Sequence, residues 1–401
     1  MLLCFGNALP SFDTSGSLVR ATVPGTEADH ALWDRWAVPF VRWDTVYFLS
    51  LAYPAYGYMY ENMLAFQPGI VAILRVLGFG YSGAWDPFVS VMRTVVLVQL
   101  LSWLAPWLLY HVTKQCTSSP RWAYRAAMLS VFAPASATSL TSPTPEPFFS
   151  VCSLLGLWCL TKEPYTHLRR ILAALCFAAA TLFRANGVFL AGFLVWHGLY
   201  LPWLTGHRRS VFQLLSALFI VVFCVGLSVA PFVLSQAWAV ERMCPGAVWC
   251  TRSWPVVYTY VQETYWDVGF LRYWHWAQLP NFALAMPVLL LGAWGCYTLR
   301  PSWRICLRET LWPWRCALSP PRRGVWDWVF VYHMMFVLAL LFFASHVQIA
   351  LRFATPGGMP LLWWAAAKAY EHPQRRRVLE GYLVMYSIIA CVLYAGFYPP
   401  A

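Results

Sequence analysis

The chain has 401 residues, of which 60% are apolar, 18% aromatic and 11% charged, and its mean hydropathy is +0.55. This composition excludes a water-soluble globule of this length, because too little polar surface is available, and it indicates an all-α polytopic membrane protein. A net charge of +12 would suit nucleic acid, but the basic residues stand singly or in short runs between apolar stretches, so we expect no nucleic-acid partner.

The first 88 residues are more polar than the rest of the chain. Residues 1–10 are apolar but too short to cross a bilayer, which takes about twenty residues, so we interpret them as the end of a truncated first helix. Residues 11–88 contain seven acidic residues and four arginines and are predicted to lie outside the bilayer, with the stretch 67–83 held at its surface. The later regions are a transmembrane helical core (89–236), an aromatic loop (237–279) and C-terminal transmembrane helices (280–401).

Asp44 lies in this polar segment beside Trp43, in the stretch 42–48 with the sequence RWDTVYF. A carboxylate held partly dry at the edge of a bilayer can serve as a base, so Asp44 is a candidate catalytic residue. The sequence also leaves two simpler alternatives open. Asp44 could pair with Arg42, or it could cap a surface helix that begins at Thr45.

Apolar segments recur after residue 88 and predict about ten transmembrane helices. They cover residues 89–112, 126–140, 146–160, 171–183, 187–204, 211–236, 280–299, 325–345, 353–367 and 378–397. Several are short and contain proline, so one adjacent pair could instead form a single broken or re-entrant helix.

Every second loop between these segments is basic. The basic loops carry Lys114, Arg121 and Arg125; Lys162, Arg169 and Arg170; Arg208 and Arg209; Arg300, Arg304, Arg308, Arg315, Arg322 and Arg323; and Lys368, Arg375, Arg376 and Arg377. Because cytosolic loops are enriched in lysine and arginine, the other helix ends are predicted to lie together on the opposite side of the membrane. That side contains the polar residues Asp44, Glu61, Glu146, Arg184, Asn186, Asp267, His346, Gln348 and Arg352.

Three side chains on this side suit a phosphate held at the membrane surface, namely Arg184, His346 and Arg352. His346 and Arg352 are six positions apart, so both can reach one ligand only if the helix breaks near them. The alternatives are that the arginines contact lipid headgroups and that His346 is an ordinary helix-end residue. Glu61 and Glu146 could likewise be helix caps.

The loop 237–279 is dense in aromatic residues. An interfacial aromatic belt is one explanation, and a sugar-binding surface that includes Glu263 and Asp267 is another. Cys244 and Cys250 lie in the same non-cytosolic loop, in a compartment that permits a disulfide between them. Most other cysteines lie inside apolar stretches and no paired CxxC motif occurs, so we expect no metal site.

Short motifs that carry further information occur in order along the chain. They are RWD (42–44), YGY (56–58), YE (60–61), AF (65–66), PG (68–69), the turn PTPE (143–146), FRANG (183–187), YWDVGFL (265–271), QLPNF (278–282), HVQ (346–348) and RF (352–353). Together they resemble the glycosylphosphatidylinositol (GPI) mannosyltransferase II family. The resemblance runs from about residue 35 to residue 365, and the stretch 265–282 is its most specific part.

The resemblance implies a GT-C glycosyltransferase fold in the endoplasmic reticulum membrane, with about ten transmembrane helices and the active site at the lumenal edge. It implies transfer of the second mannose of the GPI anchor, in α-1,6 linkage, from dolichol-phosphate-mannose to the mannosyl-glucosaminyl-phosphatidylinositol acceptor. We expect no cofactor, and the sequence leaves open whether a small membrane subunit is needed. Two departures are the short apolar start and the sequence SPTPE at 142–146, where the family more often has Tyr-Ser-Glu.

A donor with a β-linked phosphate that yields an α-mannoside requires inversion, and hence a single displacement. Under this hypothesis Asp44 takes the proton of the acceptor hydroxyl. Arg184, Arg352 and His346 bind the donor phosphate. Contacts with the acceptor or the sugar are expected from Arg42, Glu61, Glu146, Asn186, Trp266, Asp267 and Gln348.

Two other functions stay open on the sequence alone. One is a different lumenal mannosyltransferase of the same fold. The other is a polytopic transporter of a lipid or an anion, with Arg184 and Arg352 as counter-charges for the substrate. The chain shows no internal repeat and its charges gather at one side of the membrane, which favours an enzyme.

Overall fold

The computed structural model describes residues 1–13, 15, 19, 27–55, 57–58, 60–80, 83–204, 210–300, 311–312 and 325–398. Within these residues the chain is almost entirely helical and contains no β-strand, only a single antiparallel bridge between Phe79 and Trp85. Tyr56 and the predicted cytosolic residues Arg208, Arg209, Arg304, Arg308, Arg315, Arg322 and Arg323 lie outside the described residues.

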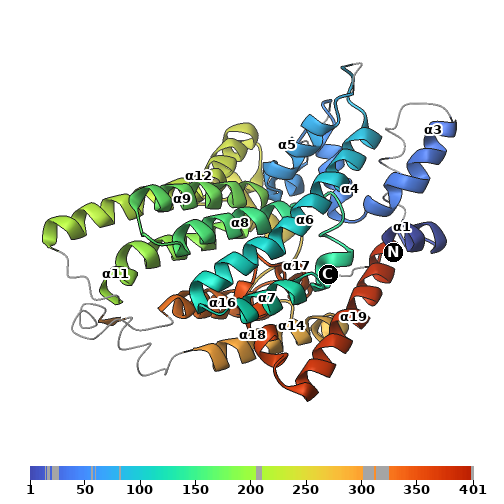
Figure 1. The fold of residues 1–401 in the computed structure, drawn as a ribbon. Coiled ribbons are helices and arrows are strands. Elements are labelled where there is room, and N and C mark those ends of the chain that lie inside the picture. The colour runs from blue at the N-terminus through green and yellow to red at the C-terminus, as the bar shows by residue number, and fades with distance from the viewer. Residues whose placement is uncertain are drawn as a thin grey trace.

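The α-helices follow one another along the whole chain (Figure 1). They are α1 (Leu2–Ala8), α3 (Glu27–Leu32), α4 (Asp44–Ala52), α5 (Pro68–Leu77), α6 (Pro87–Thr117), α7 (Pro120–Ser130), α8 (Glu146–Thr161), α9 (His167–Phe183), α10 (Ala191–Val195), α11 (Leu201–Leu204), α12 (Val211–Met243), α13 (Val257–Thr264), α14 (Leu279–Leu299), α16 (Val325–Phe343), α17 (Ala350–Phe353), α18 (Pro360–Ala369) and α19 (Pro373–Ala395). Short 3-10 or π helices connect them: η1 (Trp33–Ala37), η2 (Val38–Phe40), η3 (Glu61–Ala65), η4 (Pro134–Ala137), η5 (Ala185–Leu190), η6 (Trp196–Tyr200), η7 (Val248–Thr251), η8 (Trp276–Gln278) and η10 (Val347–Ile349).

Several helices begin where the sequence carries a capping residue. The carboxylate of Asp86 accepts hydrogen bonds from the backbone N–H groups of Phe88 and Val89 at the start of α6, at 2.7 and 3.2 Å. Thr166 caps α9 in the same way, and Ser210 forms a reciprocal capping box with Gln213 at the start of α12. These side chains satisfy N–H groups that the first turn of a helix cannot pair internally.

Five helical segments of the described chain are long and apolar enough to cross a membrane: Pro87–Thr117, Ala185–Leu204, Val211–Met243, Trp276–Leu299 and Pro373–Ala395. Shorter apolar helices are Pro68–Leu77, Glu146–Thr161 and Trp328–Phe343. The chain is therefore a multi-span membrane protein. The count of about ten crossings stays a prediction.

Three predicted segments differ in detail from the structure. The segment 126–140 is not one helix, because α7 ends at Ser130 and Pro134 starts the separate turn η4. The segment 353–367 is interrupted between α17 and α18, where residues 354–359 are not helical. Helix α12 continues to Met243, seven residues beyond the predicted end at 236, because the residues that follow 236 are good helix formers with no proline before Pro245.

The helices α6, α8, α9 and α12 lie side by side, in that order, and the buried faces of α14, α16 and α18 join them in the main hydrophobic core (Figure 1). Gly156 lets α8 approach α9 closely, since a Cβ atom at this position would lie 2.3 Å from the ring of Phe177. Gly295 plays the same role between α14 and α18, where a Cβ atom would lie 2.7 Å from that of Ala365. Small residues at helix interfaces are typical of membrane bundles.

Helix ends that the basic loops place on one side of the membrane do come together in the structure. The ammonium group of Lys368, at the end of α18, donates to the carbonyl of Thr298 near the end of α14 at 3.1 Å. Trp326, at the start of α16, donates to the hydroxyl of Tyr165 between α8 and α9 at 3.2 Å.

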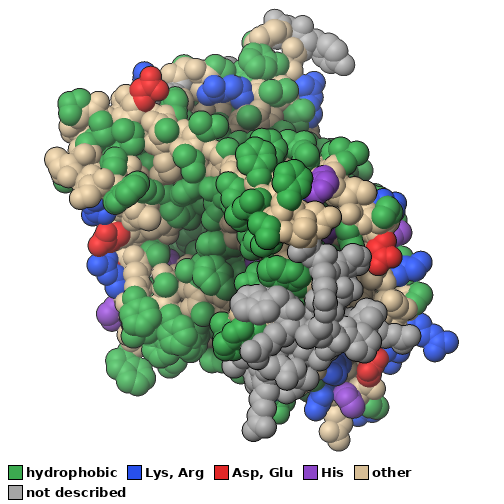
Figure 2. All heavy atoms as spheres, turned by 90° about the vertical axis from the view of Figure 1, so that its left-hand side faces the viewer, with side chains coloured by type: hydrophobic (Ala, Val, Ile, Leu, Met, Phe, Trp, Pro, Cys, Tyr) green, Lys and Arg blue, Asp and Glu red, His purple; other side chains and the backbone are tan. Residues whose placement is uncertain are grey.

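Figure 2 shows that hydrophobic side chains cover most of one face and that charged side chains lie mainly toward its edges.

The N-terminal segment packs against the end of the chain. Helix α1 lies beside α19, and the N–H group of Phe12 donates to the carbonyl of Gly396 at 2.9 Å (Figure 1). The guanidinium of Arg42 is buried and donates to the carbonyls of Val38 and Ala395, at 2.7 and 3.3 Å. Arg42 therefore fixes the start of α4 against the end of α19.

Candidate active site

A cavity of about 750 Å³ lies where the N-terminal segment meets the helix ends predicted to share one side of the membrane. Its wall contains eight of the predicted site residues: Arg42, Asp44, Arg184, Asn186, Trp266, His346, Gln348 and Arg352. Glu146 does not line the wall itself, but it follows directly on Thr144 and Pro145, which do. These residues come from segments that are up to about 300 positions apart in the sequence, as the contact between Asp44 and Arg352 shows. The prediction that topology brings them together is consistent with this cavity.

Asp44 is the first residue of α4, and the residue before it has an unusual backbone. Trp43 has φ = 53° and ψ = −127°, a region that a bulky residue rarely adopts. Its indole packs on the ring of Phe397, with ring centroids 5.6 Å apart. The strained turn at Trp43 directs Asp44 toward the cavity, where its side chain is 32% exposed.

Arg352 is the partner of Asp44, and the predicted alternative of a pair with Arg42 is wrong. Nη1 of Arg352 donates to Oδ2 of Asp44 at 2.6 Å. The carboxylate of Asp44 does not cap α4 either, because it makes no hydrogen bond with the N–H groups of the first turn. Asp44 therefore presents a half-exposed carboxylate that is held by one guanidinium.

Glu146 joins the two site arginines. Its side chain is fully buried, and its Oε1 accepts hydrogen bonds from Arg184 and from Nε of Arg352, the latter at 2.7 Å. Nη2 of Arg352 lies 2.5 Å from the same oxygen. Arg184 also donates from Nε to Asn186 at 3.1 Å and stacks over the ring of Phe353. Glu146 thus holds both guanidiniums in place, and sugar contact by Glu146 stays a prediction.

The site contains four charged groups whose charges sum to zero. They are the carboxylates of Asp44 and Glu146 and the guanidiniums of Arg184 and Arg352. Burial lowers the pKa of Arg184. Burial also disfavours the charged form of Arg352, but the charges of Glu146 and Asp44 outweigh it and raise the pKa of this guanidinium. A guanidinium does not lose its proton in proteins, so both arginines are positively charged at neutral pH and can attract an anion.

A glycine contact holds Arg352 close to Glu146. Gly357 lies against the backbone of Ser150 in α8, and a Cβ atom at this position would lie 2.1 Å from the carbonyl oxygen of Ser150. The N–H group of Gly357 donates to the hydroxyl of Ser150 at 2.8 Å. The loop after α17 is thereby clamped onto the first turn of α8, which begins at Glu146.

The helix break that His346 and Arg352 require is present. Helix α16 ends at Phe343, and η10 and α17 follow as separate turns. Nε2 of His346 donates to the carbonyl of Trp266, and the imidazole stacks on the ring of Tyr273 with centroids 4.6 Å apart. Gln348 accepts a hydrogen bond from the hydroxyl of Tyr273. Both side chains line the cavity, so phosphate contact by His346 stays a prediction.

Glu61 and Asp267 do not line the cavity. Glu61 accepts a hydrogen bond from the hydroxyl of Tyr265 at 2.9 Å. Asp267 is 73% exposed and lies 3.6 Å from Nη1 of Arg272. Sugar contact by these two acids, like sugar contact by Arg42, stays a prediction, and the structure gives each of the three a partner within the protein.

The cavity wall also contains polar residues that are not among those predicted above, including Gln67, Tyr258, Thr259 and Gln262. Tyr258 and Gln262 are four positions apart on α13, which places both on the face of the helix that lines the cavity. This spacing is the signal that could have found them in the sequence. Gln67 has no such signal, because it is a single polar residue between Phe66 and Pro68.

Part of the cavity wall is apolar. This part includes Val188, Phe189, Phe232, Leu340 and Leu341. These residues come from η5, α12 and α16, which include parts of the membrane-spanning segments. One cavity thus combines a carboxylate and two guanidiniums with an apolar wall, and an apolar wall suits a lipid chain. Within the described residues no group of three or more His, Cys, Asp or Glu side chains is placed to hold a metal ion.

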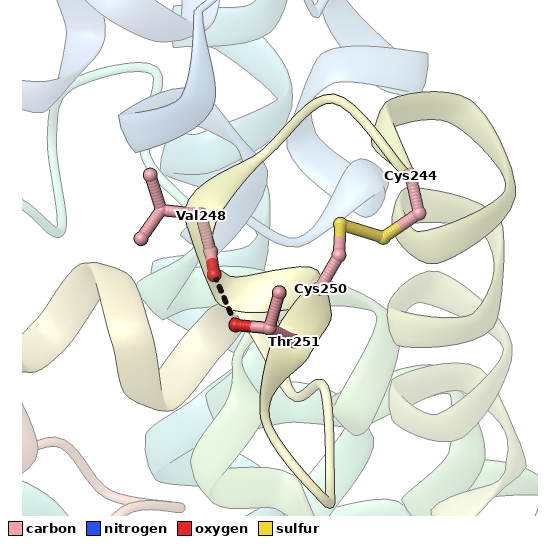
Figure 3. The surroundings of a disulfide bond; sticks show 4 residues. All are labelled: Cys244, Val248, Cys250 and Thr251. Carbon is pink, nitrogen blue, oxygen red and sulfur yellow. Dashed lines mark hydrogen bonds between the residues drawn. A yellow bond between two sulfur atoms is a disulfide. The ribbon is translucent and has the colours of Figure 1, made fainter.

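Cys244 and Cys250 form a disulfide at the end of α12 (Figure 3). The hydroxyl of Thr251 donates to the carbonyl of Val248 in the loop that the disulfide closes, at 3.0 Å. The fully buried indole of Trp249 lies in the same loop and packs with Leu64 and Ala65 of η3. The disulfide therefore stabilises a loop that supports the segment before Gln67.

Comparisons with known proteins identify the family of the chain. The family model described as Mannosyltransferase (PIG-V) matches residues 8–401. GPI mannosyltransferase 2 of Cryptococcus neoformans is 32% identical over 98% of this chain and 93% of its own length. Human GPI alpha-1,6-mannosyltransferase 2 is 29% identical over 81% of this chain and 72% of its own length.

Among solved structures, the oligosaccharyltransferase of Archaeoglobus fulgidus matches 99% of this chain and 53% of its own length, with a TM-score of 0.45 and 11% identity. The match to the family model over nearly the whole length, together with the fungal relative, shows the family. This chain belongs to the PIG-V mannosyltransferase family.

Proposed function

We propose that the cavity transfers the second mannose of the GPI anchor from dolichol-phosphate-mannose to the 6-hydroxyl of the first mannose. The family makes the chain a mannosyltransferase, which removes the transporter alternative. The names of the relatives, GPI mannosyltransferase 2 and GPI alpha-1,6-mannosyltransferase 2, support the acceptor and the linkage. A different lumenal mannosyltransferase of the same kind stays the alternative for the acceptor.

One observation carries the proposal: a half-exposed carboxylate and two guanidiniums share one cavity with an apolar wall. Asp44, Arg184 and Arg352 line this cavity, and Asp44 pairs with Arg352. The reaction needs a base for the acceptor hydroxyl, cations for the donor phosphate and space for a polyisoprenoid chain. Nη2 of Arg184 has no hydrogen-bond partner among the described residues, so it is available to the phosphate.

The transfer is a single displacement with inversion. The acceptor oxygen forms a bond with C1 of the donor mannose while Asp44 takes the hydroxyl proton. The bond between C1 and the phosphate oxygen breaks, and its electron pair stays on the phosphate. Dolichyl phosphate leaves with one more negative charge, which Arg184 and Arg352 stabilise.

Arg352 couples the two ends of this reaction, because it contacts Asp44 at 2.6 Å and also faces the cavity. Asp44 loses its negative charge when it takes the proton, and the leaving phosphate gains one at the same time. The guanidinium can then shift its attraction from the carboxylate to the phosphate, so the charge around it stays constant. Arg352 thus faces one negative charge before transfer, on Asp44, and one after it, on the phosphate. The surrounding protein dipoles therefore need to reorient little during the step.

The test is transfer by the purified protein. In detergent or nanodiscs, dolichyl phosphate mannose and a synthetic mannosyl-glucosaminyl-phosphatidylinositol should give one product with a second mannose that α-1,6-specific mannosidase removes. Omission of either lipid should give none. Transfer from a nucleotide sugar, or a product resistant to that mannosidase, would contradict the donor or the linkage that we propose.

Transfer is expected to need no divalent metal. The donor is already an activated phosphate ester, and two arginines at the cavity can disperse the charge of its leaving group. The measurement is the transfer rate before and after treatment with EDTA, with magnesium or manganese added back to a second sample. The rate should change little, and a loss that manganese restores would refute the expectation.

The membrane location follows from the same proposal. A dolichol-linked donor and a GPI precursor place the enzyme in the endoplasmic reticulum membrane with the cavity facing the lumen. The disulfide between Cys244 and Cys250, close to the cavity, is of a kind that persists in oxidising compartments. A small membrane subunit can still contribute to stability or assembly, and the purified transfer assay shows whether one is needed.

A further inference from the structure

Gln67 is a buried amide of the cavity wall that the fold does not use. The residue is 5% exposed, and neither its amide oxygen nor its amide nitrogen has a hydrogen-bond partner. Burying an amide without partners is unfavourable, and most buried amides in proteins are paired. A glutamine at this place therefore needs an explanation beyond packing.

A structural role for the side chain is not apparent from its surroundings. Gln67 occupies the N-cap position of α5, but its side chain makes no capping hydrogen bond. An apolar residue of similar size would fill the same space without leaving a buried amide unpaired. The amide is thus a cost to the folded protein in its unliganded form.

The backbone of Gln67, in contrast, is held firmly at the site. Phe66, immediately before it, packs against Trp266 with ring centroids 5.9 Å apart. Gly69, two residues later, lies against the segment that leads to Arg184, because a Cβ atom at Gly69 would be 2.7 Å from the carbonyl oxygen of Leu182. The side chain of Gln67 can turn toward the cavity without breaking any hydrogen bond, since it makes none.

We propose that Gln67 determines sugar specificity by binding adjacent hydroxyl groups of a mannose in the cavity. Its amide offers an acceptor and two donors, and each sugar hydroxyl can both donate and accept. Binding would satisfy the amide that the unliganded fold leaves unpaired. This inference rests on the proposed function and adds a residue to it, and the mannose concerned belongs to either the donor or the acceptor.

The test replaces Gln67 with methionine, which has a similar length and volume but cannot form these hydrogen bonds. Because no protein partner is lost, the melting temperature of the Gln67→Met enzyme should be unchanged or higher. Because the sugar contacts are lost, kcat/KM for mannose transfer should fall about tenfold or more. A purely structural residue would show the opposite pattern.

Gln236 is the matched control, since it is also a buried glutamine but its amide is paired. It is 7% exposed, its Oε1 accepts the N–H group of Tyr258 at 2.9 Å, and its Nε2 donates to Ser235 at 3.3 Å. Gln236→Met removes one partner of each bond, so its melting temperature should fall. The two variants together separate the loss of a protein hydrogen bond from the loss of a substrate hydrogen bond.

Kinetics in two arms identify the sugar. Donor is varied at saturating acceptor, and acceptor is varied at saturating donor. A fall in kcat/KM confined to one arm, with a raised KM for that substrate, assigns Gln67 to its mannose. A fall in both arms with unchanged KM values places the contact in the transition state, where both sugars meet.

Two results would overturn the inference. One is an unchanged kcat/KM in both arms while the wild-type enzyme is active. The other is a melting temperature that falls as far as that of Gln236→Met, and failure of both Gln67→Met and Gln67→Leu to fold counts as the same result. Wild-type protein that transfers no mannose from dolichyl phosphate mannose would instead refute the proposed function itself.

Discussion

Replacing Asp44 with asparagine is expected to lower kcat for mannose transfer by about 10²–10⁴-fold, the range that a general base contributes. Asparagine has the same shape but cannot take the proton of the acceptor hydroxyl. The KM values for donor and acceptor should change little, because Arg184, Arg352 and the apolar wall still bind them. The measurement is the initial rate of transfer by the purified variant, with both lipids varied.

Two controls make the result on Asp44 specific. The variant should enter the membrane and melt within a few degrees of the wild type, because Arg352 keeps its contacts with Glu146. If Asp44 only positioned Arg352, the donor KM would rise and kcat would change less, as expected for loss of a binding interaction. A variant with nearly normal turnover would remove Asp44 from the mechanism.

Replacing Glu146 with alanine is expected to reduce the free energy of unfolding by about 3–5 kcal/mol, the usual cost of breaking a buried ion pair. Glu146 is fully buried and pairs with both Arg184 and Arg352, so its removal leaves Arg184 without a carboxylate and leaves Arg352 with Asp44 alone. Transfer should also be lost, since the two guanidiniums repel each other and leave their positions. Thermal unfolding in detergent and the transfer assay together measure both effects.

An exposed ion pair of the same chain is the control for Glu146. Nη1 of Arg125 lies 3.1 Å from Oε1 of Glu371, and the two side chains are 38% and 54% exposed. Glu371→Ala should change the free energy of unfolding by less than about 1 kcal/mol, because water already solvates both charges. Equal losses for the two variants would contradict the role assigned to the buried cluster.

The sequence predicts which helix ends gather at the site better than it predicts the contacts within the site. The alternation of basic loops depends only on charge, and it correctly groups Asp44, Arg184 and Arg352. It fails to separate Glu146 from Glu61, since both lie on the same predicted side of the membrane. Only folding shows that Glu146 is covered by two arginines, one of them 206 positions away, whereas Glu61 meets Tyr265.

Helix ends are predicted less well than helix existence, for local reasons. The segment 126–140 is apolar enough for one helix. However, α7 ends at Ser130, because a helix cannot continue through Pro134, and the separate turn η4 begins there. The partner of Asp44 could not be read from the sequence either. Arg42 is the nearest basic residue along the chain, but its guanidinium reaches the carbonyl of Ala395, 353 positions away. Pairing at such separations depends on how the bundle packs.

Gln67 illustrates a third limit. A single glutamine in an apolar stretch carries no periodic or motif signal. Its significance rests on two structural facts, its place in the cavity wall and the lack of any protein partner for its amide. Both depend on residues that approach from α9 and from the loop before α14.

The most direct test of the account is the lipid-linked glycan in cells that lack their own second GPI mannosyltransferase. Such cells should accumulate a precursor with one mannose, measured by mass spectrometry of extracted lipids. Expression of this chain should convert that precursor to one with two mannoses and restore GPI-anchored proteins at the surface, and the Asp44→Asn chain, expressed equally, should not. Persistence of the one-mannose precursor with the wild-type chain, or full conversion by the Asp44→Asn chain, would contradict the account.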